Sequence, residues 1–143
     1  MKTTTFLDDV VNGYLDTILW VEDDDSGEQL MRQYDRSDFS PESIATAALD
    51  CSRFIGDCTR AGIDVTELPY NLRCSEDSFG RTEYTVGECL GHDLYLTRNG
   101  HGSGFWDRDE LQDDCLGSRL SDIARKMDSQ WVHVDGYGVI HIG

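Results

Sequence analysis

Positive charge is scarce in this sequence. Its 143 residues include 28 Asp and Glu but only 12 Lys and Arg, which gives a formal net charge of -16. Lys2 and Lys126 are the only lysines. Proteins that bind phosphate groups draw much of their affinity from lysine and arginine. Nucleic acid and anionic membranes are therefore not expected as direct partners, whereas a basic protein surface would be attracted.

Other features are missing as well. Proline occurs only twice, and the longest apolar run is far too short to span a membrane. There is no Cys-x-x-Cys motif and no apolar signal segment at the start. The five cysteines are irregularly spaced: Cys51, Cys58, Cys74, Cys89 and Cys115. These observations favour a protein of a reducing cytosol, with no disulfide framework, no metal site and no cofactor.

Enough apolar material remains for a core. Hydrophobic residues make up 38% of the chain and aromatic residues 10%, which is too much for a disordered tail. A chain of this length commonly forms one domain. The sequence predicts a single folded, acidic domain over residues 1–143.

Two segments show the spacing of amphipathic helices. Apolar side chains recur every three or four positions over residues 7–20, and Thr5 is suited to cap the first turn. The segment 41–61 begins at a Ser-Pro-Glu sequence typical of helix starts, and Gly62 follows it as a stop signal. Its expected buried stripe is Ile44, Ala48, Cys51, Ile55 and Cys58.

Short β-prone segments come in two pairs. Residues 94–97 and 104–106 lie on either side of an Asn-Gly step, which tolerates the positive φ angles of a tight turn. Residues 131–134 and 139–142 flank a second turn at residues 135–138. Each pair predicts an antiparallel hairpin.

The remaining segments are less regular. Helical spacing resumes over residues 111–127 and predicts a third helix. Residues 69–87 predict a long loop with one short strand around residues 81–86. Together these elements predict an α+β fold, in which a small, mostly antiparallel sheet of two hairpins packs against about three helices.

The glycine-rich segment around position 100 concentrates reactive side chains. The candidates for a binding site are His92, Asp93, Arg98, Asn99, His101 and Trp106. Glycines at 100, 102 and 104 leave the backbone bare, which suits either a ligand or a turn with unusual dihedral angles. An arginine could hold an anion and a histidine could move a proton near neutral pH. No residue is assigned a catalytic role.

Negative charge gathers in two runs. The candidates for an acidic protein interface are Glu22, Asp23, Asp24, Asp25, Glu28, Asp107, Asp109, Glu110, Asp113 and Asp114. Such runs either form solvated faces that keep a protein soluble or attract a basic partner.

Common motifs do not fit. The His92-Asp93 pair resembles the metal-binding pair of HD phosphohydrolases, but that site needs an upstream histidine and none precedes position 92. The glycines at 100, 102 and 104 lack the lysine and the following helix of a phosphate-binding loop. The run from Glu22 starts like a calcium loop, but its twelfth position is Gln33 instead of an acid.

A longer stretch resembles a known family. Residues 92–108, HDLYLTRNGHGSGFWDR, are similar to the signature of small acidic proteins encoded by tailed bacteriophages, a family without an assigned function. The likeness extends to residues 14–20, to Tyr34-Asp35 with Asp38, Pro41 and Glu42, and to Asp50-Cys51 with Arg53-Phe54. It departs at Leu94-Tyr95, where the family pattern is expected to have Phe-Trp. The resemblance implies a phage product that acts in the cytoplasm of a bacterial host, and it transfers no catalytic residues.

Three functions remain open from the sequence. The first is a non-enzymatic protein that binds and modulates a basic host protein, acting as a DNA mimic toward a factor that normally holds nucleic acid. The second is a small-ligand or metal-dependent activity over the segment from His92 to Trp106. The third is a minor structural or assembly accessory, for which a homodimer would be suitable.

Overall fold

The structure is a computed structural model that describes residues 5–143, so Lys2 lies outside the described residues. This part of the chain contains four α-helices and one small sheet: α1 (Phe6–Val21), α2 (Pro41–Arg60), α3 (Val86–Arg98), α4 (Leu116–Arg125), β1 (Val132–Val134) and β2 (Ile140–Ile142). Short 3-10 turns connect them: Leu30–Arg32, Arg36–Asp38, Val65–Glu67, Phe105–Asp107, Asp109–Leu111 and Asp113–Cys115. The fold is α+β and mainly helical.

The first two predicted helices are confirmed. The Thr5 side chain accepts a hydrogen bond from the Asp8 N–H at the start of α1, and the Asp8 carboxylate accepts one from the Thr5 N–H. Ser40 caps α2 in a similar way, with proline at the first helical position. The buried stripe of α2 is partly wrong, because Ile44 is 38% exposed whereas Phe54 is fully buried.

The hairpin predicted over residues 94–106 is wrong. Residues 86–98 form α3, which begins at a capping box between Thr85 and Glu88: the Thr85 hydroxyl accepts from the Glu88 N–H, and the Glu88 carboxylate accepts from the Thr85 N–H. The β-prone residues therefore lie in a helix, since the cap and the tertiary packing outweigh their intrinsic preference.

The Asn-Gly step ends this helix. Gly100 has a φ of 72°, and its N–H bonds to the Thr97 carbonyl. The next N–H, that of His101, donates to the Leu96 carbonyl at 2.9 Å. This pair of bonds is the usual way in which a glycine closes a helix. The same signal was interpreted from the sequence as a hairpin turn.

Two other predictions need correction. The third predicted helix is shorter than residues 111–127, because Asp114 and Cys115 have positive φ angles of 55° and 56° and α4 starts only after them. The strand predicted around residues 81–86 is not formed. Instead, residues 71–84 run out and back as an excursion with one antiparallel bridge, between Arg73 and Glu83.

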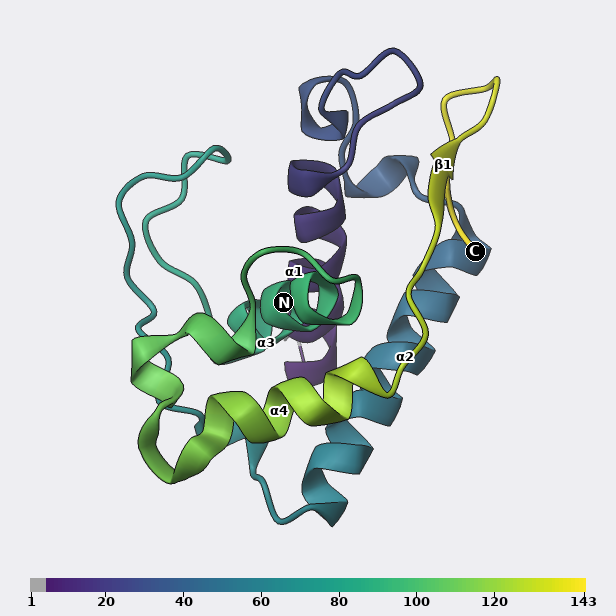
Figure 1. The fold of residues 1–143 in the computed structure, drawn as a ribbon. Coiled ribbons are helices and arrows are strands. Elements are labelled where there is room, and N and C mark those ends of the chain that lie inside the picture. Colours follow the sequence, from purple (N-terminus) through teal and green to yellow (C-terminus); the bar gives the residue numbers. More distant parts are fainter. Residues whose placement is uncertain (1–4) are drawn as a thin grey trace.

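The C-terminal hairpin is confirmed. β1 and β2 pair antiparallel, with His133 opposite His141. Ile140 and Ile142 of β2 face the core, and the Ser40 N–H donates to the Ile140 carbonyl at 2.9 Å. The hairpin thus lies along the start of α2, as Figure 1 shows.

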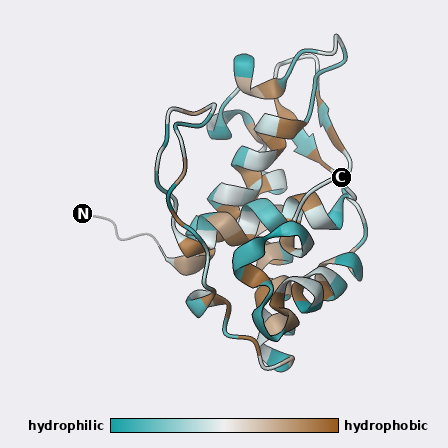
Figure 2. Ribbon diagram, turned by 60° about the vertical axis from the view of Figure 1, so that its left-hand side comes forward, coloured by the Kyte–Doolittle hydropathy of each residue, from teal (hydrophilic) through white to brown (hydrophobic). Residues whose placement is uncertain are grey.

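Glycines allow α1 and α3 to pack backbone against backbone. A Cβ on Gly91 would lie 2.0 Å from the Val10 carbonyl oxygen, and a Cβ on Gly13 would lie 2.2 Å from the Glu88 carbonyl oxygen. The other helices close around this pair, and Figure 2 shows hydrophobic residues concentrated on the packed helices and hydrophilic residues along the outer loops. No helix within residues 5–143 combines the length and apolar character needed to cross a membrane.

Candidate functional site

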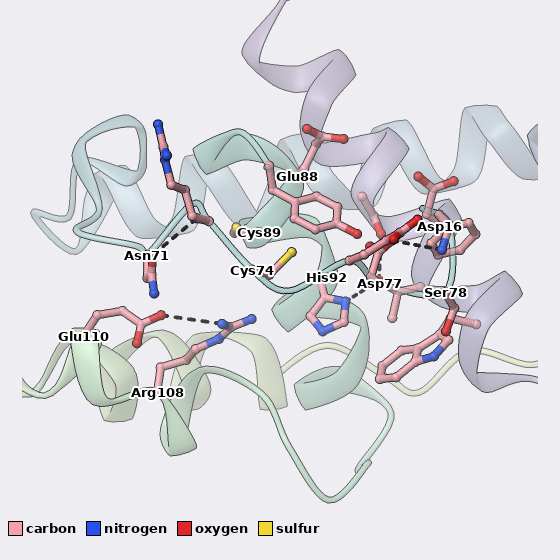
Figure 3. Close-up of a pocket in the computed structure, with 17 residues that line it drawn as sticks. Asp16, Asn71, Cys74, Asp77, Ser78, Glu88, Cys89, His92, Arg108 and Glu110 are labelled. Atoms are coloured by element: carbon pink, nitrogen blue, oxygen red, sulfur yellow. Dashed lines mark hydrogen bonds and ion pairs between the residues drawn. The ribbon is translucent and has the colours of Figure 1, made fainter. Parts of the chain in front are cut away.

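A cavity of about 770 Å³ lies between α1, α3 and the excursion formed by residues 71–84 (Figure 3). Its lining includes three aromatic side chains, a histidine and two cysteines: Trp20, Phe79, Tyr84, His92, Cys74 and Cys89. It also includes seven charged side chains: Asp16, Arg73, Glu76, Asp77, Glu88, Arg108 and Glu110. The fold therefore creates a recess on the outer side of its tightest helix pair.

A second, smaller cavity adjoins the first. Its volume is about 330 Å³, and its wall includes Ser103 and Gly104 of the glycine-rich loop. His92, Arg108 and Glu110 line both cavities. The segment that the sequence marked as a candidate thus borders a recess, although it is not a hairpin.

His92 lies at the junction of the two cavities. Its Nδ1 is 2.9 Å from the Thr17 hydroxyl oxygen on α1. Its ring stacks on Trp20, with the ring centres 5.6 Å apart. Burial lowers the pKa of His92 because a partly desolvated imidazolium is disfavoured; Arg108 acts in the same direction, while Asp93 opposes it. His92 is therefore held neutral at pH 7.

Asp93 serves the fold instead of facing a ligand. Its side chain is 1% exposed. It accepts two hydrogen bonds of 3.0 Å from the Arg108 guanidinium and one of 2.9 Å from the Tyr70 hydroxyl. Although burial opposes the charged form, the Asp93 carboxylate raises the pKa of Arg108. Asp93 thus fixes Arg108 at the cavity wall, where Arg108 also pairs with Glu110 at 3.5 Å.

Arg98 and Asn99 lie in a different, buried network. The Arg98 Nη1 is 2.8 Å from the Asp50 carboxylate of α2 and 3.3 Å from the Tyr14 hydroxyl of α1. The Asn99 side chain accepts from the Gln130 N–H at 2.7 Å. Only 7% of the Arg98 side chain is exposed. These residues join the helices, and their polar side-chain groups are engaged within the protein.

The last two candidates from the loop are separated from this network. His101 stacks on Tyr95, with ring centres 5.8 Å apart. Trp106 is 42% exposed, in the 3-10 turn that follows the loop. The structure therefore does not bring the six candidates into one site, since of these six only His92 and Asp93 line the two cavities described above.

The acidic candidates occupy two separate places. In Figure 1, residues 22–28 follow the upper end of α1, and residues 107–114 lie at the lower left, ahead of α4. Some of these carboxylates stabilise the fold, such as Glu22, which accepts from the Tyr95 hydroxyl, and Asp107, which accepts from the Gly104 N–H. Others are exposed to solvent: Asp23, Asp25, Asp109, Asp113 and Asp114.

Thr17 and the excursion were not predicted from the sequence to be parts of the site. Thr17 is a polar residue among apolar neighbours on one face of α1, and it is only 2% exposed. A lone polar residue on an apolar helix face indicates a buried hydrogen-bond partner, and this signal was present. That the partner is His92, 75 positions away, could not be read from the sequence.

The charged and sulfur-bearing groups do not form a metal site. Across residues 5–143, no three His, Cys, Asp or Glu side chains are grouped so that they could hold a metal ion. Comparisons of the chain with protein-family models, with curated proteins and with solved structures found no match.

Proposed function

We propose that this protein binds a basic partner protein, and that the binding surface is the loop formed by residues 106–114, the binding loop. The observation that supports this proposal is an exposed aromatic side chain among open carboxylates. Trp106 is 42% exposed, and Asp109, Asp113 and Asp114 in the same loop are open to solvent. Such a surface suits a partner rich in lysine and arginine.

The physical roles of the two side-chain types differ. A tryptophan commonly anchors a protein interface, because it buries a large apolar area and its ring face attracts cations. Surrounding carboxylates steer an oppositely charged partner toward the loop and raise the association rate. The net charge of -16 on the whole protein also attracts a basic partner over a longer distance.

The placement of the arginines also favours a basic protein over nucleic acid as the partner. In the described part of the chain, five arginines form ion pairs with carboxylates of the protein itself: Arg36, Arg60, Arg81, Arg98 and Arg108. They are spread over several elements and neutralised where they lie. These five arginines are therefore not free to form a positive groove of the kind that binds nucleic acid.

The partner class follows from charge together with the resemblance to phage proteins. A host factor that holds nucleic acid presents a basic surface, and carboxylates can compete for it as a DNA mimic. The protein would then act in the cytoplasm of the bacterial host and modulate that factor without catalysing a reaction.

Capture from a bacterial lysate tests this proposal. The protein is immobilised and exposed to lysate at low ionic strength, and bound proteins are identified before and after addition of duplex DNA. We expect a basic nucleic-acid-binding protein that is released both by DNA and by high salt, because the attraction is electrostatic. Capture of acidic proteins, or of a partner that neither DNA nor salt displaces, would contradict it.

A further inference from the structure

The hydrogen bond between Thr17 and His92 fixes which ring nitrogen carries the proton. The Thr17 hydroxyl has one hydrogen, and it donates that hydrogen to the Gly13 carbonyl one turn earlier, at 2.7 Å. Toward His92 the hydroxyl can then only accept. The Nδ1 of His92, 2.9 Å away, must therefore be the donor and carry the hydrogen.

The other ring nitrogen is left without a hydrogen. A neutral imidazole holds one proton, and here it is on Nδ1, so Nε2 presents a bare lone pair. Within residues 5–143 no protein group donates to this Nε2, and it is not sealed in the core. His92 lines both cavities, so a donor that enters either cavity can reach this ring.

The charged side chains around His92 Nε2 determine the charge of a ligand that can bind there. Five carboxylates and two guanidinium groups line the larger cavity. Three of the carboxylates are paired within the protein: Asp16 with Arg36, Glu88 with Arg81 and Glu110 with Arg108. Arg108 also pairs with Asp93, which leaves Glu76 and Asp77 opposite Arg73. An anion would meet an excess of like charge here, whereas a cation would not.

The aromatic wall suits the same ligand. Trp20, Phe79 and Tyr84 line the cavity, and cations are attracted to aromatic ring faces. The Arg81 guanidinium already lies 4.4 Å from the centre of the Tyr84 ring. One face of the Tyr84 ring is thus occupied by a cation of the protein itself, and Trp20 and Phe79, which are 40% and 39% exposed, remain for a ligand.

From this geometry we infer that the recess at His92 binds a small organic cation with N–H donors, an amine or a guanidinium compound, which donates a hydrogen bond to His92 Nε2. This inference goes beyond the proposed function and does not depend on it, because partner capture is attributed to the binding loop. A free amine compound and an arginine side chain of another protein share the required chemistry.

Nuclear magnetic resonance on the whole, 15N-labelled protein tests the inference directly. At neutral pH we expect the His92 ring to show a protonated Nδ1 and an unprotonated Nε2. Agmatine, which carries both an ammonium and a guanidinium group, is then titrated in, with glutarate as an anionic control of similar size. We expect a saturable shift of the His92 Nε2 signal with agmatine and none with glutarate.

Two substitutions of His92 provide matched controls. The amide of His92→Asn can keep the donor to Thr17 but removes the acceptor at the Nε2 position, and we expect agmatine to bind about tenfold more weakly. His92→Gln can place an amide oxygen near the former Nε2 and is expected to retain most of the affinity. An arginine-containing peptide titrated in parallel distinguishes a free ligand from a protein side chain.

Three results would overturn the inference. The first is a wild-type spectrum with the proton on Nε2. This test uses only the wild-type protein and does not depend on the folding of any variant. The second is an agmatine shift that does not saturate or that glutarate reproduces. The third is unchanged agmatine affinity in His92→Asn, which would mean that the cation associates with the acidic surface in general.

Discussion

Single residues in this protein have roles that their type alone did not reveal. His92, a candidate from the sequence, lines both cavities, but Asp93, its neighbour, is a buried ion-pair partner of Arg108. Adjacent positions on a helix point about 100° apart, so neighbouring residues commonly serve different surroundings. Reactive residue types could be found in the sequence, whereas their partners, which lie up to 84 positions away, could not.

His92 makes stability depend on pH. The pKa of its imidazole is lowered from the ordinary 6.5 because burial disfavours the charged ring. Below pH 6.5 the unfolded chain takes up a proton that the folded protein resists, so the free energy of unfolding should decrease as the pH falls through this value and below it. Asp93 and Asp107 oppose the shift and Arg108 supports it.

Urea unfolding at a series of pH values from neutral to about pH 5 measures this effect. His92→Asn keeps a donor toward Thr17 but cannot titrate, so its stability should fall less than that of the wild type over the same range. Parallel curves for the two proteins would show that His92 does not contribute.

The buried pair of Arg98 and Asp50 should contribute strongly to stability. Asp50→Ala leaves a guanidinium that is only 7% exposed without its carboxylate. Breaking such a buried pair costs about 3–5 kcal/mol. Asp57→Ala is the matched control, because the Asp57–Arg60 pair is mostly exposed and should change stability by about 1 kcal/mol or less. Equal losses in thermal unfolding would contradict this assignment.

At the scale of elements, local signals were reliable where they agreed with the tertiary packing. The caps at Thr5 and Ser40 and the apolar spacing after them predicted α1 and α2 correctly. α3 was missed because its residues favour strands and its Asn-Gly end was interpreted as a turn. The capping box at Thr85 and Glu88 was present in the sequence and would have indicated the helix.

The backbone contact between α1 and α3 predicts an unusual effect of alanine. Gly91→Ala would place a methyl group 2.0 Å from the Val10 carbonyl oxygen and should destabilise the protein by about 3 kcal/mol. Gly56→Ala, within α2, meets only the flexible Arg60 side chain and should stabilise by about 0.5–1 kcal/mol, since alanine favours helices. Thermal unfolding of both variants checks this, and a stabilised Gly91→Ala would disprove the close contact.

For the whole molecule, composition predicted the sign of the charge but not its distribution. Composition does not indicate that several acidic residues stabilise the fold or that the two acidic runs lie apart. The open carboxylates beside Trp106 became visible only in the structure. Because the function proposed here depends on where the charge lies, total charge and local charge must be separated by experiment.

Two triple variants make this separation. Asp109→Asn/Asp113→Asn/Asp114→Asn removes three charges from the binding loop, and Asp23→Asn/Asp25→Asn/Glu28→Gln removes three charges from the other run. Both leave the same net charge, and the asparagine at position 114 tolerates the positive φ found there.

The most direct test is the affinity of these two variants for the captured partner, measured at one ionic strength on proteins with native thermal stability. We predict that the binding-loop variant loses at least about tenfold in affinity, while the control variant stays within about threefold of the wild type. Equal weakening of both would show that the partner responds to net charge alone, and it would contradict a binding surface at residues 106–114.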